Sequence, residues 1–590
     1  MFGLRKSMKD PLADAKSAER WLASFPPGDP LAVHGQLLAE LARVADPGSR
    51  RTPAQLEAVF ALDSGTAELR RTLNSQYIDH ANRSSRIENQ LWSALFDLTQ
   101  ALLLAYQAFG REVSMHAGSS KWQQMLPELL ARQAVHLGLD AKVRLYRYEQ
   151  WIPAKWAELH ALFSVACSRQ IDRQQLTLDG SGTTTMIEYE YLLVLVLQLV
   201  HAGNVTARHL EYVAQHLAEW CQPLRFALEA SSATSFYVDL ASLYGLRRRT
   251  PAPLEGRVLF LDTRPLHAVL LQNIVVLEQK IRAQPRSERA SRREEQLALL
   301  TKLASQVDPE FKPFARRGER TVSAGTVDAI VGFNNIATYL RDEARNAVEK
   351  AQSGQSYGGT MELAVFGRLR NEQDRIHEQV RRRLAAHTAP GGPWELKDVS
   401  QTGFRLVAPM MVANAVTLGT ATAMRPHGQE GWTLGVVRRI KRLTSDRAEI
   451  GVQVIANTLL GVDLIEQRKS LDADYSVDGE VATINGRSFA GLFLALRKRG
   501  SDAPVHSLML PAVEYQPSRR LKLQTLRSIT PVKLGRLLEQ HPDWVWTVIE
   551  PLDTASLPEV WESEHLAASR EADASGIPPL RGVAGGKSKR

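Results

Sequence analysis

The spacing of apolar residues changes from a helical to an extended pattern once along this chain, just past Pro393. Before that point apolar residues recur every three or four positions, as in Leu91, Leu95 and Leu98, which places them on one face of a helix. After it, short segments alternate apolar and polar residues, which is the period of a β-strand. The sequence therefore predicts an α+β multidomain protein, with an N-terminal all-α helical array followed by an antiparallel β-barrel and a second small β-rich domain.

A chain of 590 residues is too long for one ordinary core, so we expect several domains. The helical part should contain about ten antiparallel helices, interrupted by one strand candidate, Arg257–Asp262. The predicted divisions are a partly helical extension at 1–54, the all-α region at 55–352, a linker and basic arm at 353–392, the barrel at 393–460, the second β-rich domain at 471–552 and a disordered basic tail at 562–590.

The alternating pattern also predicts individual strands, together with one short helix at Val532–Gln540. The strands expected in the barrel are Trp394–Lys397, Phe404–Val407, Val416–Ala421, Trp432–Ile440 and Ala448–Ile455. Those expected in the second β-rich domain are Glu480–Ile484, Gly491–Leu496, Ser507–Leu510, Arg520–Thr525 and Trp544–Ile549. Trp544 and Trp546 share one strand face and are expected to close the core of that second domain.

Charge, cysteine content and the length of apolar runs bear on whether the chain binds nucleic acid, lies in a reducing compartment or spans a membrane. The chain has 73 Lys and Arg residues against 64 Asp and Glu, a net charge of +9 that favours acidic partners but is too interspersed to predict nucleic-acid binding. Cys167 and Cys221 lie in helical patterns, which is typical of reduced thiols in a cytoplasmic protein. The longest apolar run, Tyr191–Val200, is about half of what spans a bilayer, so we expect no membrane span.

Motifs typical of enzymes and metal sites occur here in unsuitable contexts. Gly354-Gln-Ser-Tyr-Gly358 matches the pattern of a nucleophile elbow, but a helical pattern precedes it, which favours a linker. The histidines His201, His209 and His216 lie close in sequence without a carboxylate or cysteine to complete a set of metal ligands. We therefore expect a protein that is not an enzyme, with no catalytic residue, no metal site and no cofactor.

One turn has residue identities that point to a ligand. Asp398, Ser400 and Gly403 form the pattern Asp-x-Ser-x-x-Gly between two predicted strands. The oxygens of Asp398 and Ser400 can cap the backbone of the turn or be presented to a phosphate-bearing ligand. Gly403 is free to take a φ that other residues resist.

Two glycine-containing strands follow this turn, Leu434-Gly-Val-Val-Arg438 and Ile450-Gly-Val-Gln-Val454. Together with the turn, they resemble the PilZ domain, a small β-barrel family whose typical members bind cyclic di-GMP. The resemblance covers roughly residues 365 to 460. It implies a PilZ-like barrel here, with cyclic di-GMP as the ligand of the turn.

The family also has an Arg-x-x-x-Arg pair on an arm before the barrel, whose guanidiniums hold guanine and phosphate. No arginine between Arg368 and Arg383 is followed by another at the fourth position, and Arg383 is so close to Trp394 that little room is left for the family's first barrel strand. The closest substitute is the triple arginine of the predicted arm. The ligand-binding residues predicted on this resemblance are Arg381, Arg382, Arg383, Asp398, Ser400 and Gly403.

Two functions remain open at this point. In the first, the protein is a cyclic di-GMP receptor whose barrel relays nucleotide binding to a helical region that binds a protein partner. In the second, the barrel is degenerate and no longer binds nucleotide, and the protein is a non-enzymatic scaffold or adaptor. The intact turn favours the receptor, and the unmatched arginine pair favours the scaffold.

Overall fold

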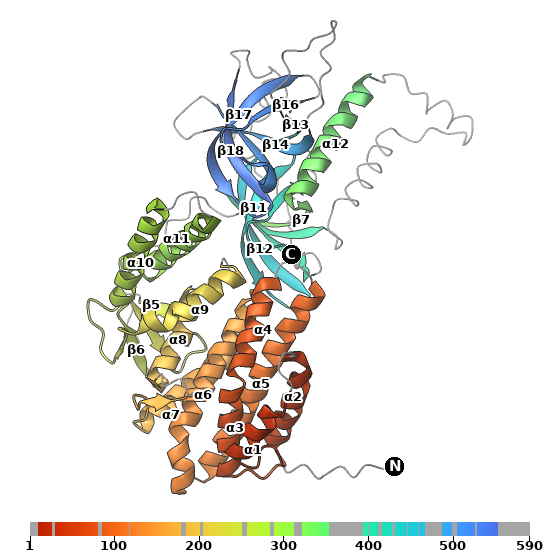
Figure 1. Ribbon diagram of the computed structural model, residues 1–590. Coiled ribbons are helices and arrows are strands. Elements are labelled where there is room, and N and C mark those ends of the chain that lie inside the picture. The colour runs from red at the N-terminus through yellow and green to blue at the C-terminus, as the bar shows by residue number, and fades with distance from the viewer. Residues whose placement is uncertain are drawn as a thin grey trace, which may run out of the picture. The chain divides into compact units, whose positions relative to one another are not determined.

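The computed structural model describes residues 10–552 except for 26–29, 81–84, 117, 179–183, 201–204, 250–255, 284–287, 312–320, 353–392, 401, 411–415, 428–430, 445, 458, 467–486, 498–503 and 526–527. The chain divides into two compact units, Met1–Phe314 and Ala315–Arg590. The first is mainly helical, and the second contains two β-barrels and a helix (Figure 1). The predicted arm at 353–392 and tail at 562–590 lie outside the described residues.

Eleven helices are described in the first unit, which confirms the predicted helical array. They are α1 (Ala15–Ala23), α2 (Pro30–Ala45), α3 (Pro53–Gly65), α4 (Ala67–His80), α5 (Ser85–Met115), α6 (Ser120–Leu145), α7 (Pro153–Ser168), α8 (Ile187–Val200), α9 (Ala207–Cys221), α10 (Arg264–Ala283) and α11 (Glu288–Val307). Local sequence fixes several of their ends. At the start of α3, Thr52 and Gln55 form a reciprocal capping box that pairs backbone donors the helix leaves free.

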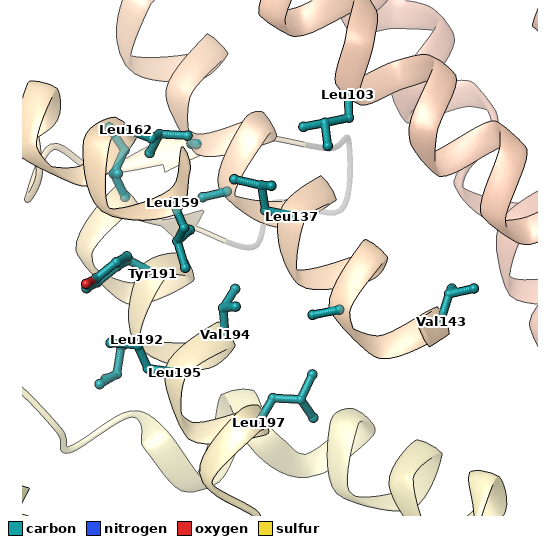
Figure 2. Packing of buried hydrophobic residues seen from close by; sticks show 14 of the residues in the cluster. Leu103, Leu137, Val143, Leu159, Leu162, Tyr191, Leu192, Val194, Leu195 and Leu197 are labelled. Carbon is teal, nitrogen blue, oxygen red and sulfur yellow. The ribbon is translucent and has the colours of Figure 1, made fainter. Parts of the chain in front are cut away.

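The apolar run that is too short to span a bilayer forms α8, a helix buried in the core of this unit. A helix that is apolar all round is stable in water only when neighbouring helices cover each side. Figure 2 shows Tyr191, Val194 and Leu195 of α8 in the same core as Leu137 of α6 and Leu159 of α7. Within the described residues no helix is long and apolar enough to cross a membrane.

The region predicted to be all-α also contains strands, so that part of the prediction is wrong. The strand candidate at 257–262 is present as β6 (Val258–Leu261), which joins β3 (Phe226–Ala227), β4 (Phe236–Asp239) and β5 (Arg247–Arg248) in a sheet of order β3-β6-β4-β5. A separate pair is made by β1 (Leu176–Thr177) and β2 (Thr184–Thr185). Phe236, Val238 and Leu261 of the sheet are buried in the helical core, which explains why such short strands persist.

The first barrel is closed by six antiparallel strands in the order β10-β11-β12-β9-β8-β7. These strands are β7 (Thr321–Val331), β8 (Trp394–Ser400), β9 (Gly403–Pro409), β10 (Ala421–Pro426), β11 (Thr433–Arg442) and β12 (Arg447–Ala456). The strand that pairs with β8 at this edge is β7, although the sequence left little room for a strand directly before Trp394. It precedes α12 (Phe333–Gln352) and lies in the range predicted to be helical.

The strand predicted at Val416–Ala421 is also misplaced. Residues 416–420 form a turn in which Thr417 donates its backbone N–H to Thr420 Oγ1 over 3.0 Å, and β10 begins at Ala421. Gly419 has a φ of 87°, a left-handed conformation that interrupts an extended strand. The turn therefore comes before β10.

The second barrel has the order β13-β14-β15-β18-β17-β16 and is also closed. Its strands are β13 (Leu459–Glu466), β14 (Ser488–Arg497), β15 (Pro504–Pro511), β16 (Arg520–Gln524), β17 (Ile529–Gln540) and β18 (Trp544–Pro551). Its interior is filled by apolar side chains from alternate positions, including Val462, Leu464 and Leu508. This barrel confirms the predicted second β-rich domain.

The helix predicted at Val532–Gln540 is wrong, because these residues are part of strand β17. Thr530, Val532 and Leu534 are buried on one face with half-buried residues between them, which is the period of a strand. Pairing with β16 on one side and β18 on the other overrides the short helical pattern. The strand predicted at Glu480–Ile484 lies outside the described residues.

The two barrels and α12 share a core. Trp544 of β18 is fully buried there with Phe333 and Ile336 of α12, and Trp546 packs against the same cluster. The two tryptophans were predicted to close the second barrel, but its interior is a separate cluster. Gly461 of β13 allows α12 to approach this strand closely, since a Cβ at this position would lie 2.3 Å from the backbone N of Arg341.

Candidate nucleotide-binding turn

The Asp-x-Ser-x-x-Gly motif lies where β8 turns into β9. Ser400 and Gly403 are register partners at the ends of these strands, and Ser400 Oγ donates a hydrogen bond to the Gly403 carbonyl oxygen over 3.2 Å. The serine therefore caps its own turn in this structure, as sequence reasoning allowed. Its hydroxyl oxygen keeps lone pairs with which it can accept a bond from a ligand.

Gly403 is required for a reason that differs from the one expected. Its φ is not left-handed. Instead, a Cβ at this position would lie 2.7 Å from the carbonyl oxygen of Val452 on β12. The glycine thus permits a close approach between β9 and β12 and itself places no side chain beside Ser400.

Asp398 is buried and ion-paired. Its Oδ2 lies 2.6 Å from Nε of Arg405, which is its register partner on β9. The Nε–H is not aligned for a hydrogen bond, so this contact is mainly ionic. Arg405 also lies 3.7 Å from Glu449 of β12. The carboxylate oxygens of Asp398 can also accept a bond from another guanidinium or from a guanine N–H that a ligand brings.

The two glycine-containing motifs place β11 and β12 beside the turn. Gln453 pairs with Gly403 across β12 and β9, and the next row contains Arg405, Gly451 and Arg439. A Cβ on Gly451 would lie 3.2 Å from that of Arg439, so the row is tightly packed. The outer face of the barrel next to the turn therefore combines bare backbone with arginines.

Strand β7 brings a second chain segment to the turn, and sequence reasoning missed it. Thr321 pairs with Val399 and Val322 with Asp398, so β7 begins directly beside the motif. The residues covalently preceding it are Arg316-Arg-Gly-Glu-Arg320, which have the Arg-x-x-x-Arg spacing of the PilZ arm. The signal was visible in the sequence, but the surrounding region was read as helical. Val322, beside Asp398, is 84% exposed.

Two other groups of arginines are candidates for the site. Arg341 and Arg345 also stand four apart, but they lie on α12, where Arg341 is 3.4 Å from Asp463 of β13. The predicted ligand residues Arg381, Arg382 and Arg383 lie outside the described residues, and their role stays a prediction. The structure thus brings Asp398, Ser400 and Gly403 together.

The described histidines among the remaining motifs lie in separate local contacts. The glycine-serine motif at 354–358 and His201 lie outside the described residues. His209 is 3.7 Å from Glu295, and His216 Nδ1 is 2.8 Å from the Tyr212 carbonyl oxygen in its own helix. In the described part of the chain no group of three metal-ligating side chains comes together.

Comparison with known families finds a match within each unit. The family described as "Cyclic-di-GMP receptor FimW, N-terminal domain" matches residues 16–231, and "Cyclic-di-GMP receptor FimW, middle PilZ domain" matches residues 340–459. The second match confirms the PilZ resemblance and includes β8 to β12, whereas β7 precedes it. No curated protein matches the chain.

Proposed function

Because the chain belongs to the FimW family of cyclic-di-GMP receptors with a PilZ domain, we propose that it binds cyclic di-GMP at the turn Asp398–Gly403. The partners of the turn in this proposal are Arg316 and Arg320, which directly precede β7. The register of β7 supports this choice, since Thr321 lies opposite Val399 between the two polar residues of the motif. Arg316 and Arg320 lie outside the described residues, and the covalent chain connects them to the start of β7.

The chemistry of these groups suits a cyclic dinucleotide. Guanidiniums can bind guanine O6 and N7 through two parallel hydrogen bonds and can pair with phosphate. Asp398 and Ser400 offer oxygens to the N–H groups of the guanine edge. The exposed side chain of Val322 and the bare backbone at Gly403 supply apolar and flat surface for the base.

Calorimetric titration with cyclic di-GMP tests this assignment. Replacing Arg316 and Arg320 with Ala should weaken binding at least about tenfold, because each lost charge-assisted hydrogen bond contributes about 1.5–3 kcal/mol. Arg381, Arg382 and Arg383 replaced together form the rival variant, and the exposed Arg282 of α10 replaced by Ala is the control. If only the triple variant lost affinity, the arm would be the segment that precedes β8.

The alternative function is a scaffold whose barrel no longer binds nucleotide. It draws support from the internal partners of the motif, since Ser400 is bonded to Gly403 and Asp398 is paired with Arg405 without any ligand. The same titration separates the two. Absence of heat with the unmodified protein at micromolar concentration would leave the scaffold as the function.

As a receptor, the protein would act without covalent chemistry, as a regulator that relays binding to a protein partner through its helical unit. Exposed apolar residues on α10, namely Leu271, Val275 and Val276, support a partner surface there. Its two free cysteines, Cys167 and Cys221, suit a reducing cytoplasm. Hydrogen exchange tests the relay: cyclic di-GMP should change amide protection within residues 16–231, and identical protection with and without nucleotide would contradict it.

A further inference from the structure

A bidentate ion pair fastens the second barrel to the nucleotide-binding face of the first. Arg438 of β11 donates two hydrogen bonds to the carboxylate of Glu539 on β17, over 2.5 Å from Nη1 to Oε1 and 2.8 Å from Nη2 to Oε2. His541 Nε2 lies 2.6 Å from the same Oε1. Burial raises the pKa of Glu539, but hydrogen bonds from His541 and Arg438 outweigh it and lower the pKa to about 2. The carboxylate is therefore charged at neutral pH.

The same arginine belongs to the face that carries the turn. Arg438 Nε donates to Gln453 Oε1 over 2.8 Å, and Gln453 is the register partner of Gly403. The turn and Arg438 are thus two strand spacings apart, about 10 Å across the sheet. A β-bulge lies at this point, where the pairing of β11 with β12 shifts between Val437 and Arg439. Bulges of this kind redirect a side chain, here toward the second barrel.

Further contacts hold the same part of the second barrel in place. Trp544 Nε1 donates to the Gly419 carbonyl oxygen over 3.1 Å. The imidazole of His541 covers Gly419 so closely that a Cβ there would lie 2.1 Å from its Nδ1. Gly419 in turn donates its N–H to the Val437 carbonyl oxygen over 2.8 Å, next to Arg438. The turn between β17 and β18 thus packs against Gly419, which is hydrogen-bonded to β11.

We propose that Glu539 is an intramolecular competitor of the nucleotide: a phosphate of cyclic di-GMP takes the guanidinium of Arg438 from it, and the β17–β18 turn is loosened from the first barrel. This inference rests on the proposed nucleotide site and adds its regulation. The guanidinium fork that holds Glu539 through both Nη atoms suits one bidentate anion, a carboxylate or a phosphate. Ligand binding and barrel contact therefore oppose each other, and their coupling is reciprocal.

Affinity measurements on matched variants test the competition. Glu539→Gln keeps the shape of the side chain and removes its charge, so it should tighten cyclic di-GMP binding by about fivefold or more. Arg438→Gln should weaken binding, because it removes the guanidinium for which Glu539 and the phosphate compete. Glu550→Gln is the control, since Glu550 lies on β18 near Lys533 and has no described contact with the first barrel. A Glu539→Gln affinity within twofold of the unmodified protein would overturn the proposal.

Hydrogen exchange on the unmodified protein gives a second test, which does not require any variant to fold. The His541 amide donates to the Trp544 carbonyl oxygen over 2.8 Å, and its protection reports on the β17–β18 turn. Saturating cyclic di-GMP should speed exchange at residues 541–544. Binding without any change there would overturn the competition and leave the site intact, whereas absence of binding would refute the proposed site itself.

Discussion

The indole of Trp544 donates a hydrogen bond to the Gly419 carbonyl oxygen across 3.1 Å, and this bond joins the second barrel to the first. Trp544 is fully buried within the cluster formed by both barrels and α12. The bond ends on a glycine with a φ of 87°, whose left-handed turn points its carbonyl at the second barrel. The two barrels are therefore joined by a specific polar contact within an apolar core.

Trp544→Phe should loosen this junction, because it leaves the Gly419 carbonyl without its donor in a buried position. We expect the free energy of unfolding of the second unit to fall by about 1–3 kcal/mol. Amide exchange at Gly419 and Thr420 should quicken. The matched control is Trp546→Phe, which removes a bond to Ser507 within the second barrel and should leave exchange at Gly419 unchanged.

Gly403→Ala should destabilise the first barrel by about 1–3 kcal/mol, since the new Cβ would meet the Val452 carbonyl oxygen. Gly325→Ala in β7 is the control, because nothing lies within 4 Å of a Cβ at that position. Chemical denaturation of both variants measures the difference. Equal stability of the two would show that β9 and β12 separate easily and that the glycine has another role.

Ser400→Ala should weaken cyclic di-GMP binding at least about tenfold, on the premise that its hydroxyl contacts a charged ligand. Its effect on stability should stay near 1 kcal/mol, the typical contribution of a single bond such as that to Gly403. Thr444→Ala, at an exposed hydroxyl of the same barrel, is the control for both measurements. Lower stability with unchanged affinity would mean that Ser400 only caps its turn.

Asp63→Asn should destabilise the helical unit by about 3–5 kcal/mol, since it leaves buried cations without their partner. Asp63 is ion-paired with Arg70 at 2.8 Å and Arg132 at 3.0 Å, and lies 3.0 Å from His136 Nε2. Burial would raise the pKa of its carboxyl, but the charges of His136, Arg70 and Arg132 bring the pKa well below its usual value.

The pH dependence of this difference follows from the lowered pKa. An acid whose pKa is lower in the folded state stabilises the fold above its unfolded pKa, and this stabilisation is lost as the pH falls through the folded pKa. The difference in the free energy of unfolding between the unmodified protein and Asp63→Asn should be constant from neutral pH down to about 4 and should shrink below that. Urea denaturation at several pH values measures it, and a gap that widens in acid would contradict the ion-pair assignment.

The sequence predicted the helical array, both β-rich domains and the turn, because each depends on local periodicity or a local motif. It missed β7, whose partner β8 lies beyond α12 in the chain, and it read β17 as a helix. Both strands are fixed by pairing with distant segments, which periodicity within a short window does not report. The arginine spacing at Arg316 and Arg320, which the proposed site uses, was missed for the same reason, since it draws attention only once β7 is placed beside the turn.

The position of β7 also determines what can be removed from this protein. β7 lies between β8 and β10, with Val327 paired to Trp394 on one side and to Pro426 on the other. A fragment that starts at residue 340, where the PilZ match begins, would lack this strand. It would be an open sheet with two bare edges, the kind of surface that recruits other chains and aggregates. A recombinant barrel should therefore begin before Thr321, upstream of the domain boundary that sequence similarity suggests.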